Sequence, residues 1–327
     1  MNQKNKIKFV SPNRNEFFPT VRKRVDQYFS ENNLSKHANG TMIWKSIVLI
    51  GLYVVPFLAL ITFKPEFPAS LLLWFLMGTG IAGIGMSVMH DANHGAYSKN
   101  SKLNYLMGHT LNLVGGSAFN WKLQHNILHH TYTNIATVDE DIKDRLVLRF
   151  SPHTNVKFYH QLQFVYAFLF YGLLTLYWVL AKDIVQFPMF IKNGTNANSP
   201  KENNAAFAKL LALKLLYFFM ILVVPVVFFH IPFLEVLPGF LLMHFVAGII
   251  LTVVFQLAHT VEGTSHPLPN GNNVIENDWA IHQMETTVNF ARKNKLLSWY
   301  VGGLNFQVEH HLFPRICMYI IRKLPRS

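Results

Sequence analysis

Long apolar stretches with few charges alternate with polar, histidine-bearing segments along most of the chain. Five stretches are predicted to be helical, at 43–63, 68–89, 158–180, about 206–229 and about 233–258. Each reaches roughly the 20 residues that a helix needs to cross the hydrocarbon core of a bilayer. Only a few residues link the first stretch to the second and the fourth to the fifth, which predicts two tight hairpins. The pattern therefore predicts an all-α integral membrane protein.

Histidines at the ends of two stretches indicate which stretches cross. His90 and His94 follow the second stretch, and His259 follows the fifth. If all five stretches crossed, these histidines would lie on opposite membrane faces and could not share one site. Segment 158–180 has a polar start and many aromatic residues, so we expect it to lie in the interface. Four transmembrane helices in two hairpins remain, with a histidine-rich cap on one face.

Composition and charge add the orientation. The chain has 327 residues, of which 51% are apolar and 14% charged, and its formal net charge is +12. A basic excess beside membrane spans indicates lysines and arginines held at the cytoplasmic face, so nucleic-acid binding is not expected. Lys64 is the one basic residue in the two outer links, which predicts that the histidines and both termini are cytoplasmic. The single cysteine, Cys317, excludes an internal disulfide framework.

Eight of the sixteen histidines form three clusters and one single site next to the apolar stretches. They are His90, His94, His125, His129, His130, His259, His310 and His311. Imidazole is a neutral ligand that suits iron, zinc, copper and nickel. Eight such ligands are more than one ion needs, so the pattern predicts a two-metal centre at a membrane surface.

The spacing within the clusters supports metal binding. The first two clusters each contain an i, i+4 pair, which lies on one helical face and can hold one metal. His130 follows His129 directly, points to a different face and could reach the second metal. Each cluster taken alone also fits cavity-facing polar residues or a basic surface patch. His230 and His244 lack a partner at such spacing and are predicted not to be ligands.

Several other polar residues could ligate a metal or support its ligands. Gln307 could coordinate through its amide oxygen, or be an ordinary helix-surface amide. Asp91 and Glu309 could accept a hydrogen bond from a ligand ring, and His282 could also support a ligand. The acidic run at 139–141 is predicted to be a solvated loop or a docking patch.

Three such boxes, in this order and separated by these hairpins, resemble the membrane fatty acid desaturases over roughly residues 9–317. The resemblance implies a cytosolic non-haem di-iron centre held by the eight histidines, which uses O2 to remove two hydrogens from a fatty acyl chain. Gln307 in place of the first histidine of the third box resembles the front-end, linoleoyl-CoA desaturase-like subgroup. Such enzymes place the new double bond between an existing one and the carboxyl end of an acyl-CoA or acyl-lipid.

The chain departs from that family in two respects. A fused cytochrome b5 with its His-Pro-Gly-Gly motif is not present, so we expect a separate ferredoxin, rubredoxin or cytochrome b5 to supply electrons. We expect a cytosolic segment at 1–42, the membrane domain at 43–317 and an atypical tail at 318–327. The family continues with a segment like Cys-His-Val-His-Tyr-Pro, where this chain reads Cys317-Met-Tyr-Ile-Ile-Arg. A one-nucleotide slip would produce this change, and we hypothesise that the tail is translated out of frame.

Three other functions share parts of the pattern. A fatty acid or lipid hydroxylase or ketolase of the same superfamily would use the same ligands and transfer oxygen instead. A membrane zinc hydrolase would typically use fewer histidines and an acidic ligand. A metal transporter would place its ligands near the bilayer midplane, whereas these lie at the ends of spans. For the desaturase we expect a narrow apolar tunnel beneath the histidines, lined by the second and fourth crossings and capped by 158–180.

Overall fold

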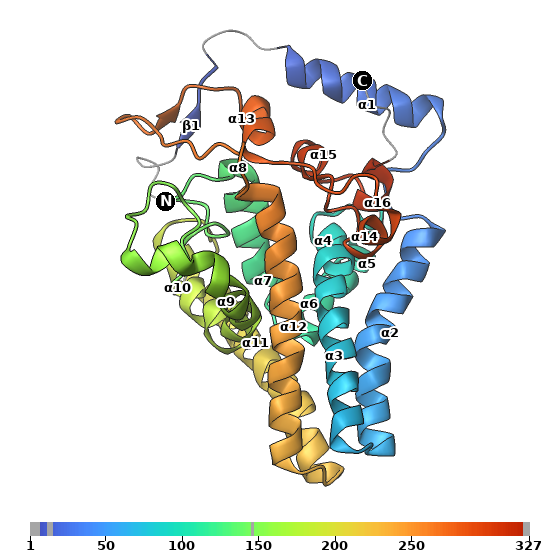
Figure 1. The fold of residues 1–327 in the computed structure, drawn as a ribbon. Helices are drawn as coiled ribbons and strands as arrows, with labels where there is room; N and C mark the ends of the chain where they lie inside the picture. Colours follow the sequence, from blue (N-terminus) through green and yellow to red (C-terminus); the bar gives the residue numbers. More distant parts are fainter. Residues whose placement is uncertain (1–6, 12–15, 145–146, 323–327) are drawn as a thin grey trace.

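The computed structural model describes residues 7–11, 16–144 and 147–322. Long helices form an elongated bundle, and short helices and loops form a cap at one end of it (Figure 1). Five helices are long and apolar enough to cross a membrane by length and composition. The chain is thus a helical integral membrane protein, as predicted.

Two helical hairpins build the bundle. The first joins α2 (Gly40–Phe63) to α3 (Phe67–Gly83), and the second joins α11 (Pro200–Phe218), with its π-helical continuation at Phe219–Phe228, to α12 (Phe233–His259). Both links lie at the end opposite the cap (Figure 1). A Cβ atom at Gly78 would lie 2.5 Å from the Met243 carbonyl oxygen, so α3 and α12 touch backbone to backbone. Small residues allow this close approach, which rigidly connects the two hairpins.

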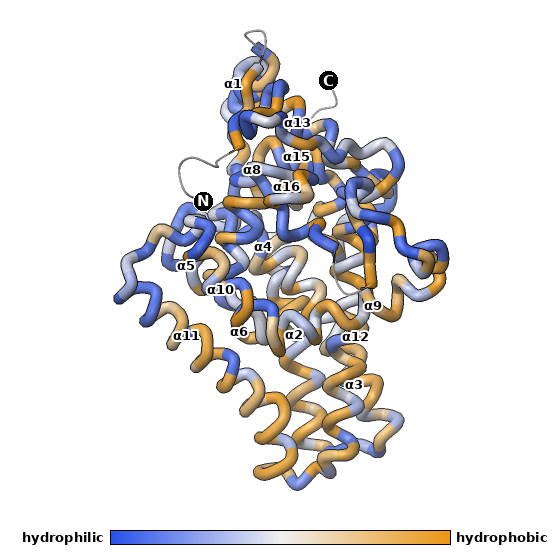
Figure 2. Tube along the Cα trace, turned by 90° about the vertical axis from the view of Figure 1, so that its left-hand side faces the viewer, coloured by the Kyte–Doolittle hydropathy of each residue, from blue (hydrophilic) through white to orange (hydrophobic). Residues whose placement is uncertain are grey.

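The helical stretch predicted at 158–180 extends to residue 192. It comprises η4 (Phe158–Leu162), α9 (Gln163–Tyr177), the π-helical η5 (Trp178–Lys182) and α10 (Asp183–Lys192). The helix continues beyond the predicted end although it contains the buried carboxylate of Asp183. This carboxylate is neutralised by an ion pair of 2.9 Å with Lys214 of α11. The helix runs across the long axes of α3 and α12 (Figure 2), and only 22% of its most apolar window is buried. By length and composition this helix is also one of the five candidate membrane spans.

The short elements lie in the cap, except that residues 110–121 pack against the bundle core (Figure 1). After α3 these are η2 (Ile84–Val88), α4 (Met89–Asn93), α5 (Ser101–Gly108), α6 (Thr110–Leu113), α7 (Ala118–Trp121), η3 (Lys122–His129) and α8 (His130–Tyr132). After α12 follow α13 (Trp279–Thr286), α14 (Lys295–Tyr300), α15 (Gln307–Leu312) and α16 (Met318–Ile321). At the N-terminal side, α1 (Phe17–Glu31) lies over the cap, and β1 (Lys8–Phe9) pairs in parallel with β2 (Val274–Ile275). The sequence analysis did not predict this small strand pair.

Two apolar cores hold these layers together. One fills the bundle around Trp74, Met77 and Met243, and the other lies under the cap, where Met42 and Met86 pack with residues 316–321. Part of the tail that we hypothesised to be out of frame is therefore buried. Residues 323–327 of that tail lie outside the described residues, and the hypothesis stays untested.

Candidate metal centre

Four helical segments carry the eight histidines to one place. The first box lies on α4, which continues α3 through η2 without a break, and the second lies on η3 and α8. The third box lies on α15, and His259 is the last residue of α12. Because the hairpins place the cap ends of α3 and α12 side by side, all four segments meet beneath the cap (Figure 1).

The histidines form two groups. In the first, one ring nitrogen from each of four residues lies within 4.8 Å of the others, and the same holds for three residues in the second. The first group is His90, His94, His125 and His310, and the second is His129, His259 and His311. His130 lies between them, with ring centroids 4.7 Å from His94 and 4.4 Å from His311. All eight predicted residues thus come together as two adjacent sites.

The second box contributes to both groups, His125 to the first and His129 to the second. The two rings nevertheless stack on each other, with centroids 5.0 Å apart, so the i, i+4 pair lies on one face of the π-helical η3. Together with Asp141 the same two histidines form a third set of possible ligand atoms, again within 4.8 Å of one another.

The unpaired ring nitrogens of these residues fit metal binding. Each of the eight histidines has at least one buried ring nitrogen without a hydrogen-bond partner in the described part of the chain. Buried polar atoms without partners are rare in proteins, and so many in one place need a common explanation. Nitrogen lone pairs converging on two points are what a pair of metal ions requires. The residues therefore fit a two-metal centre.

Acidic and amide side chains hold several of these rings in orientation. The Nδ1 atom of His129 lies 2.9 Å from Asp139, that of His125 lies 3.3 Å from Asp141, and that of His311 lies 2.8 Å from Gln283. In each case Nε2 is left free for a metal. Second partners of this kind fix ring orientation and raise ligand basicity in metal sites.

The acidic run at 139–141 is therefore not the solvated loop that we expected. Asp139 is 1% exposed, and its carboxylate also accepts hydrogen bonds from the amides of Asn134 and Asp141. These contacts fold the loop back onto η3 and turn the carboxylates inward. An acidic run ten residues after a histidine pair, in a chain so poor in charge, was the signal available in the sequence. Gln283 offered no comparable signal.

Burial keeps most of the rings neutral. Burial lowers the pKa of His130, His310 and His311 well below the usual value, and it lowers that of His125 to about 3. At His129 burial acts in the same direction, but the Asp139 carboxylate outweighs it and raises the pKa of the ring. Neutral imidazole is the form that binds a metal. A metal at His129 would compete with a proton for Nε2, while Nδ1 faces Asp139.

We expect Asp139→Ala to lower metal affinity at the second group by about 10- to 100-fold, because His129 would lose the carboxylate that orients it. Titration of the metal-free protein with Fe²⁺ measures this affinity. Asp144→Asn is the matched control, since that carboxylate accepts hydrogen bonds from the amides of Phe150 and Ser151 instead. Equal affinities in the two variants would contradict the role of Asp139.

The remaining candidate residues divide between the site and its surroundings. Gln307 is buried and faces the cavity next to the histidines, and Asp91 lies beside His90. Glu309 lies on the other face of α15, where it accepts a hydrogen bond of 2.7 Å from Asn289. His282 belongs to neither group, and its ring packs 4.9 Å from that of Phe9.

The other histidines singled out in the sequence lie away from both groups. The ring of His244 hydrogen-bonds the Tyr217 hydroxyl at 2.7 Å within the bundle. His230 lies in the link before α12, at the end remote from the cap. One residue was not singled out at all: the Asn134 side chain donates to the carbonyls of His259 and Thr286, and so connects η3 and α8 to the end of α12.

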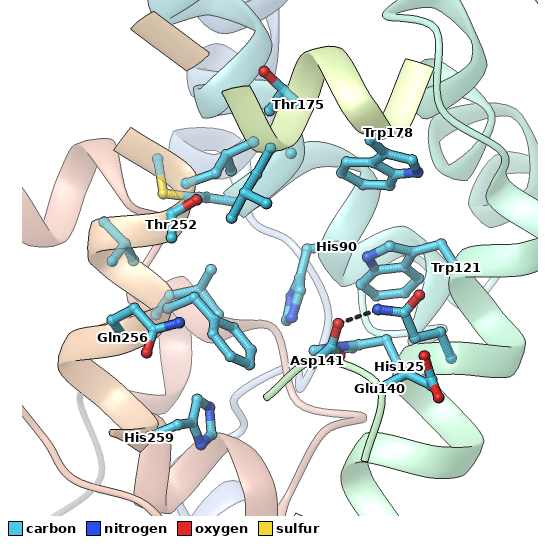
Figure 3. Close-up of a pocket in the computed structure, with 18 of the residues that line it drawn as sticks. His90, Trp121, His125, Glu140, Asp141, Thr175, Trp178, Thr252, Gln256 and His259 are labelled. Atoms are coloured by element: carbon cyan, nitrogen blue, oxygen red, sulfur yellow. Dashed lines mark hydrogen bonds and ion pairs between the residues drawn. The ribbon is translucent and has the colours of Figure 1, made fainter. Parts of the chain in front are cut away.

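An apolar cavity of about 210 Å³ adjoins the histidines. His90, His125 and His259 reach it from three different elements (Figure 3). Its walls come from η2 and α4, from α12 and from the helix at 158–192, including Met86, Met89, Leu174, Trp178, Leu251 and Phe255. A smaller cavity continues from it between Leu111, Val114 and His244, and shares Thr175 and Trp178 with the first. These are the walls expected for the acyl tunnel.

Comparison with known proteins agrees with this architecture. The family model described as fatty acid desaturase matches residues 66–326, which include all eight histidines. An sn-1 linoleoyl-lipid 6-desaturase of Arthrospira platensis is 36% identical over 92% of this chain and 81% of its own length. The enzyme of the same name from Synechocystis sp. is 36% identical over 95% and 86%, and an acyl-lipid (8-3)-desaturase of Physcomitrium patens is 32% identical over 95% and 65%. The chain belongs to the fatty acid desaturase family.

Proposed function

We propose that this fatty acyl desaturase acts on a linoleoyl chain carried by a membrane lipid, and places a double bond between the existing ones and the carboxyl end. The observation that carries the proposal is the apolar cavity that runs past both histidine groups. The names of the relatives support a lipid-bound linoleoyl chain as the substrate. They also make position 6 the first position to test.

In this proposal the histidines hold the metal ions and the apolar residues of the cavity hold the acyl chain. Two non-haem iron ions, when bound by the two histidine groups, would supply the oxidative chemistry that removes two hydrogens from neighbouring methylene groups. The balance requires O2, two electrons from a separate carrier and two protons, and yields two waters. Met89, Leu251 and Phe255 hold the acyl chain against the histidines and exclude water from it.

The electron donor in this proposal is a separate ferredoxin, rubredoxin or cytochrome b5. The histidines lie at the cap ends of the hairpins, so a water-soluble carrier would approach them from the side of the cap. Purified chain, reduced in turn by each carrier, should show which one supports product formation. Product formed in the absence of all three carriers would contradict the need for a separate protein donor.

We propose four crossings, with the helix at 158–192 in the interface and the cap in the cytoplasm. Two features support this arrangement. The lower hairpins are mostly apolar while polar residues gather in the cap (Figure 2), and the helix at 158–192 runs across the hairpins. Lys64 is the one basic residue in the two links remote from the cap, which by the positive-inside rule puts the cap inside. Cysteine labelling from either membrane face, at positions introduced in the two links, tests the orientation.

Gas chromatography–mass spectrometry of a host that expresses the chain and a ferredoxin, and is fed linoleate, tests the function. We expect one new double bond on the carboxyl side of the existing pair. After a short pulse of labelled linoleate, the product should appear in the lipid fraction before the acyl-CoA pool. A hydroxylated product would indicate the hydroxylase of the same superfamily. Metal-loaded, reduced protein that forms no product would contradict desaturation.

A further inference from the structure

The chain segment that follows the third histidine box is buried against the first box. All five residues of 317–321 are less than 10% exposed, and four of them form the short helix α16. The amide of Cys317 donates to the Lys36 carbonyl at 2.8 Å, which holds the segment to the chain before α2. The atypical tail therefore begins as a packed part of the cap.

One carboxylate connects this segment to the first box. Asp91 is 1% exposed and lies between His90 and the tail. Its Oδ2 atom accepts a hydrogen bond of 3.2 Å from the backbone amide of Met318, and the Cys317 thiol bonds to the same carboxylate. Its Oδ1 atom lies 3.6 Å from Nδ1 of His90.

A buried carboxylate depends on such partners for its position. Leaving an ionised group without hydrogen bonds in an apolar surrounding is costly, so Asp91 takes the orientation in which the tail satisfies it. That orientation places Oδ1 3.6 Å from Nδ1 of His90, so the carboxylate faces the His90 ring without forming a hydrogen bond to it. The second group takes its orientation from Asp139 and Gln283 instead.

We propose that the turn at 317–321 is a clasp that positions Asp91, and through it His90, in the four-histidine group. The Met318 amide is the contact that closes this clasp. Asp91 and Met318 are positioning residues, because neither reaches the cavity that would hold the acyl chain. The inference rests on the proposed two-metal function. It assigns to one of the two metal sites a dependence on the tail that the other site does not share.

Replacing Met318 with proline tests the clasp, because it removes the amide hydrogen and little else. Met318 is the first residue of α16, where proline is tolerated, and Cys317 has φ −52° and ψ 124°, which suits a residue before proline. Met318→Ala is the matched control, since it also shortens the buried side chain but keeps the amide. Iron content per chain and the Mössbauer spectrum of ⁵⁷Fe-loaded protein report the two sites separately.

We expect Met318→Ala to bind two ions with the affinity of the unaltered chain. Met318→Pro should bind one ion unchanged and the other about 10- to 100-fold more weakly, the size typical of losing a partner of a ligand. Equal affinities in Met318→Pro and Met318→Ala would overturn the clasp. Loss of both ions to the same extent would also overturn it, because it would indicate general unfolding.

The single cysteine gives a second readout that needs no metal. Cys317 is fully buried and is the one cysteine of the chain. In metal-free protein, a maleimide should modify Cys317 at least about 10-fold faster in Met318→Pro than in Met318→Ala, because one hydrogen bond to a charged group is lost. Equal rates would overturn the clasp. If the unaltered chain bound no pair of ions, the proposed function would be refuted. The rates of Cys317 modification in Met318→Pro and Met318→Ala would still show whether the clasp exists.

Discussion

The His129→Ala variant is expected to form double bonds more than about 100-fold more slowly than the unaltered chain, while the protein is still inserted in the membrane. The ring of His129 is completely buried, and its centroid lies 4.7 Å from that of His259 and 5.0 Å from that of His311. Its removal reduces the second group from three histidines to two. Loss of a residue that only supports a ligand typically lowers metal affinity or activity by about 10- to 100-fold, and loss of a ligand should cost more.

Fatty-acid analysis and iron content, both per amount of inserted protein, measure this effect. His153→Ala is a suitable control, because it removes an exposed imidazole that belongs to neither group, and we expect it to retain full product. Since His129 lies in the second group, the variant should keep an ion at the first. A well-expressed His129→Ala protein with undiminished product would reject the ligand assignment.

Stability is expected to fall by about 3–5 kcal/mol in Lys214→Met, because the change leaves the Asp183 carboxylate buried without its cation. The Lys214 ammonium lies 2.9 Å from Asp183 and also donates to the carbonyls of Gly115 and Val179, at 3.0 and 2.9 Å. It therefore ties α11 both to the π-helical turn of η5 and to the glycine turn after α6. The smaller cavity is lined by Trp178 and Val179 of η5 and by Gly116 of the glycine turn.

Thermal or denaturant unfolding in detergent measures the loss. Lys209→Met is the control on the same helix: its ammonium is exposed and donates to the Tyr105 hydroxyl, and we expect a change within about 0.5 kcal/mol. The double variant Lys214→Met with Asp183→Leu should recover most of the stability, because an apolar pair often replaces a buried ion pair without loss. If Lys214→Met unfolds like the unaltered chain, the ion pair contributes no net stability.

The amino-acid sequence by itself determined the class of fold and the histidines of the candidate metal centre. Stretch length and low charge predict membrane helices because both are local properties of the chain. The candidate ligands can also be recognised from local sequence, since eight imidazoles next to apolar spans are difficult to explain other than by metal binding. The sequence also predicted that the stretches before His90 and His259 end on the same side of the molecule, because only then could the two residues share a site.

The tertiary structure decided how those residues are used. Spacing could not show which histidines of different boxes share a group, because that depends on how α4, η3, α12 and α15 pack against one another. Nor could it reveal that Asp139 is buried, since an acidic side chain is turned inward only when amides and a ring some residues away supply its hydrogen bonds. The contact between Asp91 and Met318 joins residues 227 positions apart. Such contacts depend on how the hairpins and the cap pack in space, which no local pattern encodes.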